Sequence, residues 1–265
     1  MLIGVLGCGW LGLPLATSLV REGWIVKGST TSHSKLKDLE EKKIEPFLIL
    51  INEHHITGNI NLFLSNLDIL IINIPPKLRS IPSANYVSKI KLLIKSIETN
   101  KVKKILFIGS TSIYANDNSI VTENTFPKPE TESGTQLLET EQQLLSNKNF
   151  LTTILRFGGL FDEYRNPANF LAGKTNVANP KAAVNLIHKI DCIEIIKSII
   201  KKDIWGETFN AAFPVHPAKN NYYTKKSLEA GLKPPTFNVL KPSKGKTIDS
   251  SKLINKLNYN FKKEL

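Results

Sequence analysis

Cysteine is scarce in this chain: its 265 residues include only Cys8 and Cys192. Two distant cysteines do not suggest a disulfide framework, and they lack the spacing of a metal site, so we expect no bound metal. No apolar stretch reaches the roughly 18 residues of a membrane-spanning helix. The apolar run at the N-terminus is short, is interrupted by glycines and has no basic leader. We therefore expect a cytoplasmic protein without a membrane partner.

Arginine is also scarce, because Arg21, Arg79, Arg156 and Arg165 are the only arginines among 35 basic residues. The formal charge is nevertheless +12, which raises nucleic-acid or ribosome association as one hypothesis. The lysines are scattered and no basic cluster rich in aromatic residues stands out, so the sequence disfavours nucleic acid as a partner. The charge also attracts anionic cofactors and substrates.

Short apolar runs alternate with helical patterns, which indicates an α/β protein whose parallel strands are joined by crossover helices. The pattern is regular up to residue 160 and looser beyond it. We therefore predict an NAD(P)-binding domain at 1–160 and a C-terminal lobe at 161–265, packed on it and returning elements to the sheet. The predicted strands are 2–7, 24–30, 45–50, 67–76, 103–110, 150–160 and 206–213. The predicted helices are 12–23, 34–44, 85–99, 133–145 and 224–232, with a short strand and a helix within 184–202.

The glycines Gly7, Gly9 and Gly12 form a G-x-G-x-x-G string between the first predicted strand and its helix. In a dinucleotide fingerprint the first glycine permits the tight turn, the second lets the backbone approach the pyrophosphate, and the third allows close helix–strand packing. Trp10 and Leu11 complete the turn, and the helix N-terminus attracts phosphate. We predict a dinucleotide site here; the alternative is a turn that has only a structural role.

The end of the second predicted strand indicates which cofactor is bound. NAD-binding proteins carry an acidic residue there, roughly 20 residues after the turn. The segment 27–35, KGSTTSHSK, has none, and Ser29 lies 29 − 7 = 22 residues after Gly7. Ser29, Thr30 and Thr31 suit a 2′-phosphate. The nearby bases are Lys27, His33 and Lys35. We predict NADP in preference to NAD; alternatively, the hydroxyls cap the next helix.

Further along the chain, several motifs follow in order: GCGWLGLPLA, GSTSIY, RFGGL, FLAGKTN, NLIH, HPAKNNYY and KGKTID. Together they resemble atypical or extended short-chain dehydrogenases/reductases of the NAD-dependent epimerase/dehydratase-like type, in particular the bacterial YeeZ-type branch. The resemblance covers about residues 2–260. It implies a Rossmann-type, doubly wound and mostly parallel sheet of about seven strands, with a small C-terminal lobe that covers the substrate.

The resemblance also implies roles for individual residues. Asn73, Ile74 and Pro75 would line the cofactor after the fourth strand. Ser110 would occupy the catalytic Ser/Thr position beside the cofactor and would hydrogen-bond a substrate carbonyl or hydroxyl. Tyr114, four residues later, is usually a structural residue in the family.

Four side chains are candidate substrate contacts. The resemblance implies that the loop beginning at Arg156, and also His188, face the cleft. Tyr164 and Arg165 follow in the next loop and suit an anionic substrate. We therefore expect a small-molecule substrate that is anionic or resembles a sugar nucleotide.

The family's catalytic Tyr-x-x-x-Lys helix is not reproduced. Ser133 stands at the tyrosine position and Leu137 at the lysine position. Serine has no useful acidity near neutral pH, and general acid–base catalysis needs a group of suitable pKa. Tyr114 and His188 are alternative proton donors, whereas Glu141 on this helix is expected to be solvated.

Two functions therefore compete. One is an NADP-dependent oxidoreductase, or a nucleotide-sugar epimerase/dehydratase-like enzyme, with a rearranged proton donor. The other is a catalytically silent NAD(P)-binding protein used in redox sensing or regulation. The sequence is compatible with a homodimer but leaves the oligomeric state open.

Overall fold

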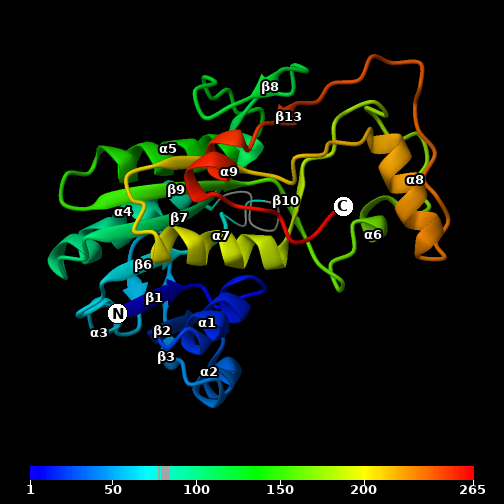
Figure 1. Ribbon diagram of the computed structural model, residues 1–265. Helices are drawn as coiled ribbons and strands as arrows, with labels where there is room; N and C mark the ends of the chain where they lie inside the picture. Colours follow the sequence, from blue (N-terminus) through cyan, green and yellow to red (C-terminus); the bar gives the residue numbers. More distant parts are fainter. Residues whose placement is uncertain (77, 79–83) are drawn as a thin grey trace. The chain divides into compact units, whose positions relative to one another are not determined.

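A seven-stranded sheet organises the chain. The computed structural model describes residues 1–76, 78 and 84–265 (Figure 1). The strand order is β12-β9-β7-β6-β1-β2-β3. The strands are β1 (Leu2–Leu6), β2 (Ile25–Thr30), β3 (Glu45–Leu48), β6 (Ile69–Ile72), β7 (Lys104–Ser110), β9 (Leu151–Phe157) and β12 (Thr208–Ala211).

The strand pairs from β3 to β7 are parallel, and Val5 of β1 faces Gly28 of β2 on one side and Ile71 of β6 on the other. The order reverses at β1, because β2 and β3 extend one side while β6 begins the other. In open α/β sheets, ligands bind at such a switch point, beyond the carboxyl ends of the strands. The predicted Rossmann-type α/β fold is confirmed.

Helices alternate with these strands. The spacing of apolar residues along each helix determines which of its faces is buried. In α4, Ile90, Leu93 and Ile97 recur at helical spacing and are completely buried. The helices are α1 (Gly12–Arg21), α2 (Leu36–Glu41), α3 (Ile60–Leu64), α4 (Tyr86–Thr99), α5 (Glu132–Ser146), α6 (Ala168–Leu171), α7 (Lys189–Lys201), α8 (Lys219–Glu229) and α9 (Ser251–Leu257). Within the described ranges, none is both long and apolar enough to cross a membrane.

The chain divides into two compact units. Unit 1 comprises Met1–Ser110, Thr131–Arg156 and Ile196–Thr208, and unit 2 comprises Thr111–Glu130, Phe157–Ile195 and Phe209–Leu265. Unit 2 contains two short parallel pairs. These pairs are β10 (Gly159–Phe161) with β11 (Leu186–His188), and β8 (Ile120–Val121) with β13 (Thr247–Ile248). The assignment of 1–160 to cofactor binding and 161–265 to a substrate lobe stays a prediction.

Some element boundaries differ from the expected ones. The strand expected at 45–50 ends at Leu48, and β4 (Leu50–Ile51) then pairs antiparallel with β5 (Ile56–Thr57). The strand expected at 150–160 divides at Gly158, where a Cβ atom would lie 2.6 Å from the Asn185 carbonyl oxygen. The helix expected at 224–232 runs from Lys219 to Glu229 instead.

Candidate functional site

Two of the three glycines in the turn after β1 are required by the fold itself. Gly7 has φ +103°, and a Cβ atom there would lie 2.6 Å from the Asn73 carbonyl oxygen. A Cβ atom on Gly12 would overlap the Gly7 carbonyl oxygen. These two positions therefore stay glycine so that the turn can form and α1 can pack against β1.

Gly9 differs from both. It is exposed, its φ lies outside the left-handed region, and a Cβ atom there would meet no other atom within 4 Å. Neither the backbone conformation nor the packing of the described residues demands a glycine here. The open space beside Gly9, at the N-terminus of α1, is the place where a dinucleotide fingerprint receives the pyrophosphate.

Hydrogen bonds from β2 and β6 hold the turn in place. The Gly7 N–H donates to Ser29 Oγ at 2.9 Å, and the Cys8 N–H donates to the Ser29 carbonyl oxygen at 2.7 Å. Asn73 Nδ2 donates to the Gly7 carbonyl oxygen at 3.0 Å. The buried Ser29, predicted to contact the cofactor, thus positions the turn. Burial also raises the pKa of the Cys8 thiol to about 12, which leaves it unreactive.

The loop after β2 carries the other residues predicted to select the cofactor. Thr30 is buried, and its Oγ1 accepts the Ser32 N–H at 3.1 Å. Thr31 and Lys35 are exposed, as a contact with a 2′-phosphate would require. Lys27 is engaged elsewhere, because its Nζ donates to the Leu62 carbonyl oxygen at 2.7 Å and also to Ser65, at the end of α3.

The segment after β6 and the rest of the turn lie in unit 1 as well. Ile74 and Pro75 follow Asn73, and the Ile74 carbonyl oxygen accepts the hydroxyl of the buried Tyr86 at 2.7 Å. Leu11 is buried, whereas Trp10 is half-buried. The predicted cofactor residues around the turn thus occur on the carboxyl ends of β1, β2 and β6, with Asn73 linking two of these ends.

Helix α5 carries the positions where the resemblance implies the catalytic dyad. Ser133, Leu137 and Glu141 recur every four residues, so they share one face of the helix. Leu137 is buried and Ser133 is half-buried. Among the described residues, this face presents no tyrosine or lysine.

Glu141 is not solvated as expected: only 1% of it is exposed, and it binds Arg156 of β9. Arg156 Nη2 donates to Glu141 Oε2 at 2.7 Å, and Arg156 Nε donates to the same oxygen at 3.0 Å. Burial raises the pKa of Glu141, against the lowering effect of Arg156. Gly109 makes room for this pair, because a Cβ atom there would lie 2.8 Å from Glu141 Oε1. Arg156 is therefore not among the residues that we propose to contact a substrate.

The two predicted catalytic residues belong to different units. Ser110 is the half-buried last residue of β7 in unit 1. Tyr114 lies in unit 2, is 1% exposed, and donates its hydroxyl to Asn210 Oδ1 at 3.1 Å. The phenol of Tyr114 is therefore buried and hydrogen-bonded inside unit 2.

The other predicted substrate residues gather in unit 2 near β10 and β11. His188 is buried, its Nδ1 accepts the Ile190 N–H at 3.1 Å, and its Nε2 lies 3.4 Å from Glu163 Oε1. This arrangement assigns the ring proton of the neutral imidazole to Nε2. Tyr164 is exposed, and the guanidinium carbon of Arg165 lies 5.9 Å from the Phe170 ring centroid.

Asp162 holds this loop. Its Oδ1 accepts the N–H groups of Tyr164 at 3.0 Å and Arg165 at 2.6 Å, and its Oδ2 binds Lys189 Nζ. Burial opposes ionisation of Asp162, but these hydrogen bonds together lower its pKa. Asp162 is thus a positioning residue for Tyr164 and Arg165.

We expect the free energy of unfolding of Asp162→Asn to fall less between pH 7 and pH 3 than that of the unsubstituted protein. Because folding lowers the pKa of Asp162, its carboxylate stabilises the protein above about pH 4, the usual Asp range, and this stabilisation is lost as the pH falls through the folded-state pKa. The measurement is the free energy of urea unfolding from pH 7 to pH 3, with the exposed Glu139→Gln as control. Equal acid sensitivity in Asp162→Asn and the unsubstituted protein would contradict this role.

No protein-family model matches the chain. Protein YeeZ of Escherichia coli K12 is 33% identical to it over 261 residues, which cover 98% of this chain and 95% of YeeZ. The chain belongs to the YeeZ family. The resemblance inferred from the ordered motifs is thereby confirmed.

Solved structures agree with this YeeZ-family assignment at the level of the fold. UDP-glucuronic acid 4-epimerase from Bacillus cereus in complex with NAD has a TM-score of 0.79 at 18% identity, covering 100% of this chain and 93% of the epimerase. A short-chain dehydrogenase/reductase superfamily protein from Agrobacterium tumefaciens with bound NAD has a TM-score of 0.77 at 15% identity, covering 100% and 93% of the two chains. The YeeZ-family chain thus has an epimerase-like Rossmann fold.

Three important groups were not singled out in the sequence: Asp162, Asn210 and the buried pairing of Glu141. Asp162 follows an apolar strand directly, which is a usable signal for a positioning carboxylate. Asn210 lies in a strand and Glu141 in a helix, and the sequence does not reveal the distant residues with which they pair.

Proposed function

We propose that this protein binds a nicotinamide dinucleotide at the turn containing Gly7, Gly9 and Gly12. The observation that carries the proposal is Gly9, whose missing side chain leaves a space that the fold does not otherwise need. Two fold relatives were solved with NAD, which supports the same class of cofactor here. Bound nicotinamide supplies a carbon that accepts or donates a hydride.

We propose NADP in preference to NAD. The segment 27–35 at the end of β2 contains no acidic residue, and the exposed Thr31 and Lys35 suit a 2′-phosphate. Ser29 is a poor site for a test because its hydroxyl already accepts the Gly7 N–H. Thr31 offers a test without that disturbance.

Thr31→Asp is expected to weaken NADPH binding about tenfold and to leave NADH binding equal or tighter. The new carboxylate would repel a 2′-phosphate and accept hydrogen bonds from a ribose hydroxyl. The measurement is a fluorescence titration with each nucleotide. Thr57→Asp, which adds the same charge at an exposed position on β5, is the control. An unchanged ratio of NADPH to NADH affinity would remove the 2′-phosphate assignment.

We propose that the reaction is that of an oxidoreductase or a nucleotide-sugar epimerase-like enzyme acting on a small, anionic substrate. Ser110 is the group proposed to hydrogen-bond the reacting oxygen, and His188, Tyr164 and Arg165 are proposed substrate contacts. The solved complex of MoeE5 with UDP-glucose and NAD supports this substrate class. Its TM-score is 0.79 at 16% identity.

A catalytically silent NAD(P)-binding regulator is the second candidate, and two features favour it. The family resemblance assigns Ser133 and Leu137 to the dyad positions, and the Tyr114 phenol is buried against Asn210. Turnover assays with NADPH and a panel of aldehydes, ketones and nucleotide sugars separate the two functions. Turnover that is lost in Ser110→Ala supports the enzyme, whereas tight NADPH binding without turnover supports the regulator.

A further inference from the structure

A cavity of about 360 Å³ in unit 2 has a lining unlike the sites described above. Its lining residues are Asn118, Lys181, Ala183, Ser243, Lys246 and Thr247. The lining thus includes two lysines and two hydroxyl-bearing residues, and it contains no acidic residue. A cavity of this size accommodates a small organic molecule.

Lys246 is only partly solvated. Its Nζ donates to the Tyr114 carbonyl oxygen, and loss of hydration lowers its pKa although the carboxylates of Glu130 and Asp117 raise it. Neither carboxylate is hydrogen-bonded to Lys246: Glu130 accepts from Asn116, and Asp117 accepts the Ser119 hydroxyl at 2.6 Å. Among the described residues, Lys246 has no carboxylate within ion-pair distance. A partly desolvated ammonium that lacks a direct counter-charge favours an anion beside it.

Hydrogen bonds within unit 2 hold together the chain segments that carry Lys181 and Lys246. Asn118 Nδ2 donates to the Ser243 carbonyl oxygen at 3.0 Å, and the Asn118 N–H donates to the Gly245 carbonyl oxygen at 2.7 Å. The Lys181 N–H donates to Ser243 Oγ at 3.0 Å, so the Ser243 hydroxyl proton remains available to a ligand. The Thr247 N–H donates to the Ser119 carbonyl oxygen at 2.9 Å. These bonds fix the positions from which the lysines reach the cavity.

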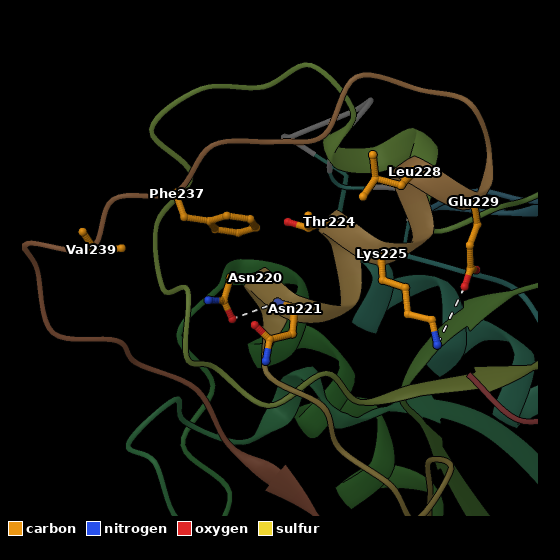
Figure 2. Close-up of a pocket in the computed structure, with 8 residues that line it drawn as sticks. All are labelled: Asn220, Asn221, Thr224, Lys225, Leu228, Glu229, Phe237 and Val239. Carbon is orange, nitrogen blue, oxygen red and sulfur yellow. Dashed lines mark hydrogen bonds and ion pairs between the residues drawn. The ribbon is translucent and has the colours of Figure 1, made fainter.

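A second cavity in unit 2 provides an internal comparison. Its volume is about 570 Å³, and α8 and the segment around Phe237 line it (Figure 2). Figure 2 shows Lys225 directed toward Glu229, whose carboxylate lies 3.8 Å from Lys225 Nζ and 3.2 Å from Lys226 Nζ. Positive charge at that cavity is balanced by a carboxylate of the same helix, so its lining does not select an anion.

We propose that the cavity bordered by Lys181 and Lys246 binds the phosphate group of a small phosphorylated molecule. Two ammonium point charges match a phosphate dianion, and the hydroxyls of Ser243 and Thr247 add neutral donors for its remaining oxygens. The cavity exceeds the size of a phosphate ion, which leaves room for the organic part of the ligand. The proposal concerns unit 2 alone and does not depend on cofactor binding at the glycine turn.

The test is isothermal titration calorimetry of the full chain with glucose 1-phosphate, inorganic phosphate and glucose. We expect both phosphates to bind and glucose not to bind. Tighter binding of glucose 1-phosphate than of inorganic phosphate identifies an organic phosphate as the ligand, whereas equal binding identifies the free ion. Absence of binding by either phosphate would overturn the proposal.

Matched variants locate the site. Lys181→Gln and Lys246→Gln are each expected to weaken phosphate binding at least about tenfold, whereas Lys225→Gln at the comparison cavity stays within twofold. Glutamine at 246 keeps an N–H donor for the Tyr114 carbonyl oxygen, and Lys181 is exposed, so its variant decides the outcome if Lys246→Gln unfolds. Equal weakening of phosphate binding in all three variants would show only nonspecific attraction to the protein's positive charge and would contradict the proposal. NADPH titration of the same variants reports separately on the glycine turn.

Discussion

Gly9→Ala is expected to weaken NADPH binding at least about 100-fold while the protein stays fully folded. The added methyl group enters the space proposed for the pyrophosphate, which corresponds to a loss of about 2.7 kcal/mol of binding free energy. The same methyl group meets no protein atom within 4 Å, and the residue's φ is acceptable to alanine. The melting temperature of Gly9→Ala should therefore be unchanged or slightly higher, because alanine restricts the unfolded chain more than glycine does.

Gly12→Ala is the matched comparison for this prediction. Its Cβ atom would overlap the Gly7 carbonyl oxygen, so this variant is expected to lose both stability and binding. Fluorescence titration and thermal unfolding of the two variants separate a ligand requirement from a packing requirement. NADPH binding by Gly9→Ala at the affinity of the unsubstituted protein would contradict the assignment of the turn.

Arg156→Met is expected to lower the free energy of unfolding by about 3–5 kcal/mol. The substitution leaves the Glu141 carboxylate buried without its partner, which costs far more than the loss of an exposed ion pair. Urea denaturation measures the change. Arg21→Met, at the exposed end of α1, should change stability by less than about 0.5 kcal/mol.

The double variant Glu141→Leu/Arg156→Met distinguishes a stability loss caused by an unpaired buried charge from one caused by lost side-chain packing. It should be more stable than Arg156→Met alone, because no unpaired charge then remains between α5 and β9. If the losses of unfolding free energy in Glu141→Leu and Arg156→Met add up to the loss in the double variant, the pair does not anchor α5. A loss below about 1 kcal/mol in Arg156→Met would show the same.

The sheet and the glycine turn could be predicted because their signals are local. The run 2–6 is apolar, Gly7 and Gly12 supply backbone freedom within a few residues, and the helix follows at once. The order of the motifs was enough to indicate the YeeZ family, which the identity to YeeZ confirms. The absence of the catalytic dyad stays a prediction, because it rests only on the offsets of Ser133 and Leu137 from Ser110.

The contacts that decide the roles of single residues could not be read from the sequence because they join distant segments. Ser29 was expected to face the cofactor, yet its hydroxyl accepts the N–H of Gly7, which precedes it by 22 residues. Tyr114 pairs with Asn210 across 96 residues. Glu141 was expected to be solvated, yet it pairs with Arg156 of β9. Such pairings depend on which helix face meets the sheet, and local composition does not encode that choice.

The most direct test of cofactor binding at the glycine turn is a crystal structure of the protein grown with saturating NADPH. We expect the pyrophosphate to lie against the backbone of Gly9, at the N-terminus of α1, with the 2′-phosphate near Thr31. A dinucleotide bound elsewhere, or electron density showing only solvent beside Gly9 at saturation, would contradict this expectation.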